Sequence, residues 1–257
     1  MTVAPERQAT WLRRYHDTDA RAELICFPHA GGSAGYWHAL SAAARPALGV
    51  RAVQYPGRQD RYREPAVRDL HRLADLIAEA LGDGPPPAGP RIFLGHSMGA
   101  SLAHEVALRL AGAPDREPAA LLVSGRRAPS RTVPGAERLD TDAALLAKVR
   151  SLGGTVPAVL DDPDLLDLVL PALRGDYAAL AAYVPSAGTV LACPVVALTG
   201  DSDPEAPVAD VRAWRDHTTG PFELRVFPGG HFFLGDHLPA VADLAAALSA
   251  AAPAARR

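Results

Sequence analysis

The chain has 257 residues, 48% of them hydrophobic, so it can bury a large core and is not a disordered protein. Its formal net charge of -3 leaves no basic field for nucleic acid, and its two cysteines lie in apolar runs, where we expect free thiols. The sequence shows neither a signal-peptide core nor an apolar run of about 18 residues, so we expect a cytoplasmic protein that does not bind membranes.

The first strong signal is the apolar segment 22–27, which predicts a buried strand. It runs into the glycine-rich loop 28–32 (PHAGG), followed by a helical pattern over 36–44. A strand, a glycine-rich loop and a helix also begin a phosphate site, but the spacing fits neither G-x-G-x-x-G nor the lysine-bearing phosphate loop. We interpret the loop as half of an oxyanion hole, with the Ala30 N–H as donor. A loop whose glycines only allow a tight turn is the alternative.

The next segments continue the alternation of strand and helix. Residues 50–55 predict a second strand, the polar loop 56–65 is rich in arginine, and 67–81 has the apolar face of a helix. The proline-rich stretch 82–90 is expected to be a surface loop, because the strand after it must pair with the first strand.

Residues 91–100 (RIFLGHSMGA) carry the motif G-x-S-x-G between an apolar strand and a helix. A strand that stops at Gly95 and a helix that begins at Ser97 leave a sharp turn, which lifts one hydroxyl clear of the sheet edge. A side chain in place of either glycine would collide with the neighbouring backbone. We therefore predict that Ser97 is a nucleophile, and that the N–H of Met98 is the second oxyanion donor. The pentapeptide alone is weak evidence, since an ordinary strand-to-helix loop can contain it by chance.

After a strand over 119–124 the alternation breaks. Residues 125–140 are rich in arginine and proline, and helices are predicted over 142–152, 163–170 and 172–183 with no strand between them. Helices inserted between strands at the edge that carries the site most simply form a lid. We therefore expect a single domain, 1–257, with a helical lid insertion over 126–185. Residues in the lid that could line the pocket, or only pack the lid on the core, are Leu165, Leu166 and Val169.

The remaining members of a catalytic triad follow late in the chain. A strand is predicted over 194–199, and two acids, Asp201 and Asp203, follow it. Spacing alone does not decide which of them orients the base. A helix is predicted over 207–217, a strand over 222–227 and a last helix over 238–251. The loop between the last two places His231 where the general base belongs, with His237 as the second candidate. His29 and His96 are expected near this site, but no ligand-type spacing predicts a metal.

The whole chain resembles the type II thioesterases, free-standing α/β-hydrolases that accompany polyketide and nonribosomal peptide synthases. The motifs that carry the resemblance are 27–32 (FPHAGG), 54–58 (QYPGR), 95–99 (GHSMG), the lid stretch 152–177 and 230–233 (GHFF). General hydrolases share the serine motif but neither the QYPGR loop nor the lid pattern. The resemblance implies an α/β-hydrolase fold, with a mostly parallel central sheet flanked by helices and a helical lid, and it selects Asp203 as the acid.

The resemblance also implies the reaction. Such enzymes remove aberrant or stalled acyl groups from the phosphopantetheine arm of a carrier protein through an acyl-serine intermediate, with no cofactor of their own, and we expect a monomer. Carriers of this kind are typically acidic, so we expect arginines at the site entrance to contact them or, equally, only to face solvent. They are Arg58, Arg61, Arg63, Arg126, Arg127 and Arg131. The alternatives are a general esterase or lipase acting on small free esters, and a non-catalytic binding protein of the same fold.

Overall fold

A single seven-stranded sheet organises the computed structural model, which describes residues 4–83, 86–113, 115–154, 161–188 and 190–252. The strand order is β1-β3-β2-β4-β5-β6-β7, and every neighbouring pair is parallel except β1 with β3. This confirms the predicted mostly parallel sheet. The strands are β1 Leu12–Arg13, β2 Glu23–Phe27, β3 Gly49–Val53, β4 Arg91–His96, β5 Ala120–Ser124, β6 Val195–Gly200 and β7 Phe222–Phe227.

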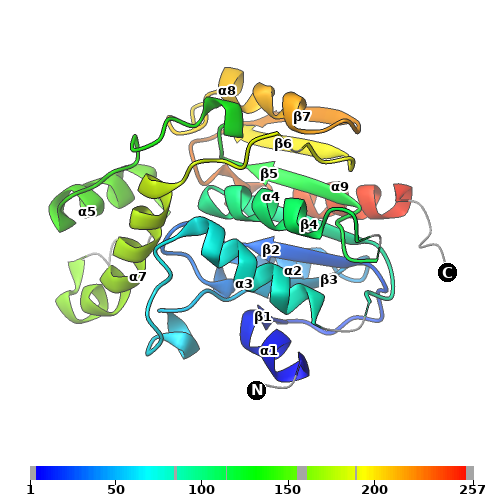
Figure 1. Cartoon of the computed structure of the whole chain (residues 1–257), viewed down its shortest axis with the longest axis horizontal. Coiled ribbons are helices and arrows are strands. Elements are labelled where there is room, and N and C mark those ends of the chain that lie inside the picture. Colours follow the sequence, from blue (N-terminus) through cyan, green and yellow to red (C-terminus); the bar gives the residue numbers. More distant parts are fainter. Residues whose placement is uncertain (1–3, 84–85, 114, 155–160, 189, 253–257) are drawn as a thin grey trace.

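Helices cover both faces of the sheet (Figure 1). Helices α3 and α4 lie on one face, and α2 and α9 lie on the other. The helices are α1 Ala4–Trp11, α2 His38–Ala43, α3 Leu70–Gly82, α4 Met98–Leu110, α5 Asp142–Leu152, α7 Pro163–Ala182, α8 Val208–Arg212 and α9 Leu238–Ala251, with 3-10 turns at Ala34–Trp37, Gln59–Arg61, Pro129–Arg131, Ala213–His217 and Phe233–Asp236. No helix in the described ranges is long and apolar enough to cross a membrane.

The apolar strands are buried on both faces. In β2, Ile25 and Phe27 pack into the core beneath α3 and α4, whereas Leu24 and Cys26 pack against α2 and α9. Successive side chains of a strand point to opposite faces, so a strand covered on both sides has to be apolar throughout. This is why continuous apolar runs in the sequence mark the central strands. Both cysteines are free thiols, as expected.

Several helix boundaries differ from their predicted positions. Helix α3 begins at Leu70 and not at residue 67, because the Asp69 carboxylate accepts the N–H of Arg72 at 2.9 Å and caps the helix there. The helices predicted over 36–44 and 207–217 each form as a 3-10 turn joined to a short α-helix. Helix α1 and strand β1 were not predicted, since β1 has only two residues and exists through its pairing with β3.

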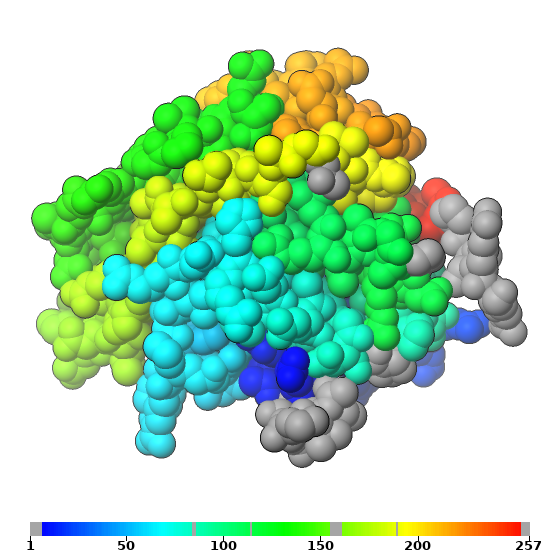
Figure 2. Space-filling model, viewed as in Figure 1, coloured from blue at the N-terminus to red at the C-terminus, as the bar shows by residue number. Residues whose placement is uncertain are grey.

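The segment 126–185, predicted to be a lid and called the lid below, contains one long helix, α7, where the sequence predicted two. Helix α7 runs from Pro163 to Ala182 and passes through Pro171. Proline inside a helix removes one hydrogen bond and costs about 3 kcal/mol. Two features offset this cost: Pro171 lies on the exposed side of α7, and the buried side packs against α5 in a common apolar cluster. In Figure 2 the lid forms one flank of the molecule and lies against the loop before α3. Residues 155–160 of the predicted lid lie outside the described residues.

Candidate active site

The predicted catalytic residues lie on loops that follow the carboxyl ends of neighbouring strands. The register pairs Phe27 with Gly95, and His96 with Ser124, so β2, β4 and β5 end at the same level. Ser97 follows β4, Asp203 follows β6 and His231 follows β7. In an open parallel sheet this edge is where ligands bind, because the loops after the strands converge there.

The turn at Ser97 has the geometry of a nucleophile elbow. Ser97 has φ 55° and ψ -120°, a conformation that non-glycine residues rarely adopt. A Cβ atom at Gly95 would overlap the carbonyl oxygen of Gly99, and one at Gly99 would overlap the carbonyl oxygen of Phe27. Both glycines are therefore needed for the tight passage from β4 to α4. The strain holds the half-buried Ser97 side chain at the sheet edge.

His231 is paired with Asp203. Its Nδ1 lies 2.9 Å and 3.0 Å from the two carboxylate oxygens, and both residues are buried. The same carboxylate accepts the backbone N–H groups of Glu205 at 2.9 Å and Ala206 at 3.3 Å, which fixes its orientation. Because an ionised carboxylate only accepts hydrogen bonds, Nδ1 carries the ring hydrogen and Nε2 is left as the basic nitrogen.

The competing residues lie elsewhere. Asp201 is exposed, and its carboxylate accepts the N–H of Gly229 at 3.0 Å, so it supports the turn before the histidine loop. The ring of His237 bonds the carbonyl oxygen of Pro228 at 3.1 Å. The geometry therefore favours Asp203 and His231 over these two alternatives.

The candidate base, His231, lies near the residue that precedes the candidate nucleophile, Ser97. The ring of His231 is 5.1 Å, centroid to centroid, from the ring of His96, the residue that precedes Ser97. Among the described side chains no hydrogen bond joins Ser97 to His231. Catalytic hydrogen bonds are often long without substrate and tighten in the substrate complex. The arrangement supports the assignment of Ser97, Asp203 and His231 as a triad.

In the loop after β2, the amide predicted to line the oxyanion hole differs from its two neighbours in its hydrogen bonding within the described ranges. The N–H of Gly32 donates to the His29 carbonyl at 2.9 Å, and that of Gly31 donates to the Asp176 carboxylate at 2.7 Å. The N–H of Ala30, between them and the strand, has no acceptor among the described residues. Met98 is the first residue of α4, where helical N–H groups lack an acceptor within the helix. Both amides are thus available to a developing oxyanion.

Two further histidines lie near His231: the ring of His96 packs against it, and the ring of His29 packs against that of His96. Burial lowers the pKa of His29 to about 3, with smaller contributions from His231 and Arg58, and it lowers the pKa of His96 well below its usual value. Both rings are therefore uncharged at neutral pH. Among the described residues no group of three or more His, Cys, Asp or Glu side chains is arranged to hold a metal ion.

These buried histidines predict that the protein loses stability in mild acid. Burial also lowers the pKa of His104, which packs against Trp214 with both ring nitrogens buried and unpaired in the described structure. Their folded-state pKa values lie below the unfolded value of about 6.5, so the unfolded chain takes up protons first. Stability present above about pH 6.5 is therefore lost as the pH falls toward the folded pKa values.

Urea unfolding at about pH 7.5 and about pH 5.5 measures this loss. The change His104→Phe removes one of these titrating rings. It should therefore reduce the loss of unfolding free energy between the two pH values by about 1 kcal/mol. Equal losses in the variant and the wild type would show that His104 does not contribute.

The lid packs directly on the loop 28–32, which is predicted to form half of the oxyanion hole and is called the oxyanion loop below. A buried cluster joins α5 to α7, and Ala30, Leu166 and Val169 pack against it. Leu165 is not part of this cluster and is 40% exposed, and its role in a pocket wall stays a prediction. The cluster comprises Leu145, Val149, Leu170, Leu173 and Tyr177.

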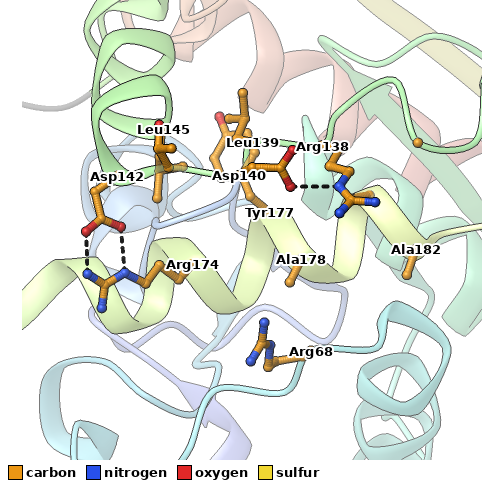
Figure 3. Close-up of a pocket in the computed structure, with 13 residues that line it drawn as sticks. Arg68, Arg138, Leu139, Asp140, Asp142, Leu145, Arg174, Tyr177, Ala178 and Ala182 are labelled. Carbon is orange, nitrogen blue, oxygen red and sulfur yellow. Dashed lines mark hydrogen bonds and ion pairs between the residues drawn. The ribbon is translucent and has the colours of Figure 1, made fainter.

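A hollow of about 590 Å³ lies between the segment 135–145 and α7 (Figure 3). Two ion pairs border it, Arg174 with Asp142 and Arg138 with Asp140, and Arg68 approaches it from the loop before α3. None of the predicted catalytic residues lines this hollow. It is therefore a feature of the lid surface and not the acyl site itself.

Three of the six arginines predicted to meet a carrier protein are buried, which corrects that prediction. They are Arg58, Arg61 and Arg126, and they pair with Asp176, Glu64 and Glu137, respectively. A guanidinium group held in this way supports loop structure and cannot reach a partner protein. Arg63 and Arg131 are exposed, and Arg127 is half-buried with two hydrogen bonds to the Glu205 carbonyl.

Sequence reasoning assigned no role to Asp176. It is buried and bonds the oxyanion loop from the lid helix. The sequence stretch LRGDY within the lid motif contained this residue, but no local pattern could show its partners, which lie more than 100 residues away along the chain.

Comparisons with known proteins agree with this arrangement. A family model described as a thioesterase domain matches residues 22–248. A probable cadicidin biosynthesis thioesterase of Streptomyces griseus is 51% identical over 99% of this chain and 71% of its own length. Thioesterase PikA5 of Streptomyces venezuelae is 45% identical over 88% of this chain and 80% of its own. The solved structure of the type II thioesterase BorB from the borrelidin biosynthetic cluster matches with a TM-score of 0.85 at 44% identity, covering 93% of this chain and 97% of that one.

Proposed function

Because the chain belongs to the thioesterase family, we propose that it is a type II thioesterase that removes aberrant or stalled acyl groups from carrier proteins of a polyketide or nonribosomal peptide synthase. The observation that carries the chemistry is the strained Ser97 at the same sheet edge as the Asp203–His231 pair. The relatives that work in such pathways support the choice of substrate.

The proposed reaction is acyl transfer in two steps. His231 Nε2 takes the proton of Ser97 as the hydroxyl attacks the thioester carbonyl, and Asp203 holds the resulting imidazolium. The N–H groups of Ala30 and Met98 stabilise the oxyanion. The thiol leaves with the proton from His231, and water then attacks the acyl-serine by the same route to release the carboxylic acid.

The phosphopantetheine thiol of the carrier is the leaving group in this proposal, and the enzyme needs no cofactor of its own. We propose that it acts as a cytoplasmic monomer beside its synthase. The carrier is expected to dock through the exposed arginines Arg63 and Arg131, and through Arg68 at the hollow, by charge complementarity with an acidic surface.

Docking predicts that carrier-linked acyl groups are better substrates than the same groups on a small thiol. We expect the kcat/KM for an acetyl or propionyl carrier protein to exceed that for the acetyl or propionyl thioester of N-acetylcysteamine. The variant Arg63→Glu/Arg68→Glu should lower the first value and its salt dependence and leave the second unchanged.

The matched control is Arg21→Glu, an exposed arginine before β2 at the opposite edge of the sheet, which should change neither value. Equal kcat/KM on both thiols would remove the carrier as partner while keeping the serine chemistry. A preference for oxygen esters would favour a general esterase, and the lack of any hydrolysis would favour a binding protein.

A further inference from the structure

A buried ion pair between Asp176 of the lid helix α7 and Arg58 of the loop after β3 holds the oxyanion loop through hydrogen bonds. The Asp176 carboxylate of α7 accepts hydrogen bonds from Arg58 at 2.7 Å and 2.8 Å, one to each oxygen. The oxygen at 2.7 Å from Arg58 also accepts the N–H of Gly31 at 2.7 Å. Arg58 in turn donates to the carbonyl oxygen of Gly32 at 3.0 Å. Asp176 is 1% exposed and Arg58 is 6% exposed, so water does not compete for these bonds.

The geometry of Gly31 shows what these bonds hold in place. Gly31 has φ +75°, and the Gly32 N–H bonds the His29 carbonyl, which makes a tight turn over 29–32 with glycine at its third position. A Cβ at Gly31 would overlap the side chain of Leu173 on α7. The loop therefore fits closely under the lid helix, and its backbone is fixed from that side.

We propose that Asp176 and Arg58 are positioning residues for the oxyanion hole, and that they make its geometry depend on the seating of α7. The Gly31 N–H donates to Asp176 and the Gly32 N–H donates to His29, so in this turn the Ala30 N–H is the one without an acceptor among the described residues. If α7 moves away, the carboxylate leaves with it and the loop loses this constraint.

The placement of the charges supports a positioning role over a purely stabilising one. Taking two charges out of water costs free energy, and their attraction offsets this cost only with good geometry and further hydrogen bonds. An apolar pair can therefore often replace a buried ion pair without loss of stability. Here both oxygens of Asp176 are used, and one of the donors is an amide of the loop that carries Ala30. An apolar pair could not hold that amide.

The test rests on the proposed acyl-serine chemistry and compares two kinds of inhibitor. A trifluoromethyl ketone that mimics the acyl group forms a tetrahedral oxyanion on Ser97, whereas a thioether with CH2 in place of the carbonyl fills the same pocket without one. Asp176→Ala should lower kcat for acetyl-N-acetylcysteamine and the affinity for the ketone by about tenfold to a hundredfold, less than the loss of an oxyanion donor itself. KM and the thioether affinity should change little.

Asp176→Asn gives a graded result and covers the case in which the alanine variant does not fold. One amide oxygen cannot serve Gly31 and both Arg58 donors, so we expect a smaller loss in the same direction. The control is Glu23→Ala, which removes an ion-pair partner of Arg51 and Arg91 at the opposite edge of the sheet. It should lower the unfolding temperature and leave kcat and the ratio of the two affinities unchanged.

Two results overturn the positioning role. The first is a folded Asp176 variant whose kcat and ketone affinity remain at wild-type values. The second is a folded Asp176 variant in which the affinities for the ketone and the thioether fall by the same factor. These results differ from a failure of the proposed function, in which the wild type neither hydrolyses the thioester nor binds the ketone.

Discussion

Ser97→Ala is expected to reduce acyl-thioester hydrolysis by a factor of about a thousand or more. The alanine side chain fits the strained turn as well as serine does, so the change removes the attacking oxygen and leaves the fold in place. Residual hydrolysis would come from the oxyanion amides and from substrate binding alone. The measurement is release of acetate or propionate from an acylated carrier protein, with circular dichroism to show that the variant is folded.

Covalent labelling separates the role of this serine from a general effect on the fold. A fluorophosphonate should label the wild type and fail to label Ser97→Ala. Ser101→Ala is the matched control, because this buried serine lies on α4 four residues after Ser97 and should leave the labelling intact. Labelling of Ser97→Ala at wild-type rates would exclude Ser97 as the nucleophile.

Asp203→Asn is expected to lower kcat by about 10³ to 10⁴. The carboxamide keeps the size of the side chain but removes the negative charge that stabilises the imidazolium of His231. It also no longer forces the ring hydrogen onto Nδ1, so the wrong nitrogen can face the nucleophile. The bonds from the N–H groups of Glu205 and Ala206 can be retained by the amide oxygen, so the loop should stay in place.

The matched control for this prediction is Asp201→Asn, two residues earlier in the same loop. Asp201 is exposed and supports the turn at Gly229 without contacting His231, so its loss should leave kcat close to the wild-type value. The opposite result, a large loss in Asp201→Asn and a small one in Asp203→Asn, would transfer the acid role to Asp201.

Much of the fold was predictable because its signals are local. A strand buried on both faces has to be apolar throughout, and β2, β4, β5 and β6 show this in their sequences. The turn at Ser97 could also be predicted from the sequence, because only glycine fits at positions 95 and 99, where the neighbouring backbone leaves no room for a side chain. Helix α5, which the Thr141 side chain caps, begins and ends at the predicted residues.

The errors arose where tertiary packing outweighs local preference. Pro171 predicts a helix boundary, but α7 continues through it because its buried face packs against α5. Strand β1 is too short to show a pattern and depends on β3 for its hydrogen bonds. The arginine-rich loop after β3 resembles a solvated surface, yet Arg58 and Arg61 are buried by partners that the loop's composition does not reveal.

The sequence by itself therefore determined the parallel strands of the sheet, the order of the candidate triad along the chain and the strained serine, since each depends on residues that are neighbours in the chain. Residue spacing left the choice between Asp201 and Asp203 open, and the family resemblance selected Asp203; the tertiary structure shows its contact with His231. The tertiary structure alone decided which residues hold the oxyanion loop. Asp203 and Asp201 have nearly the same position in sequence, but only Asp203 is buried against the ring. Asp176 reaches Gly31 across 145 residues, a contact made by packing the lid on the sheet edge and encoded in no local pattern.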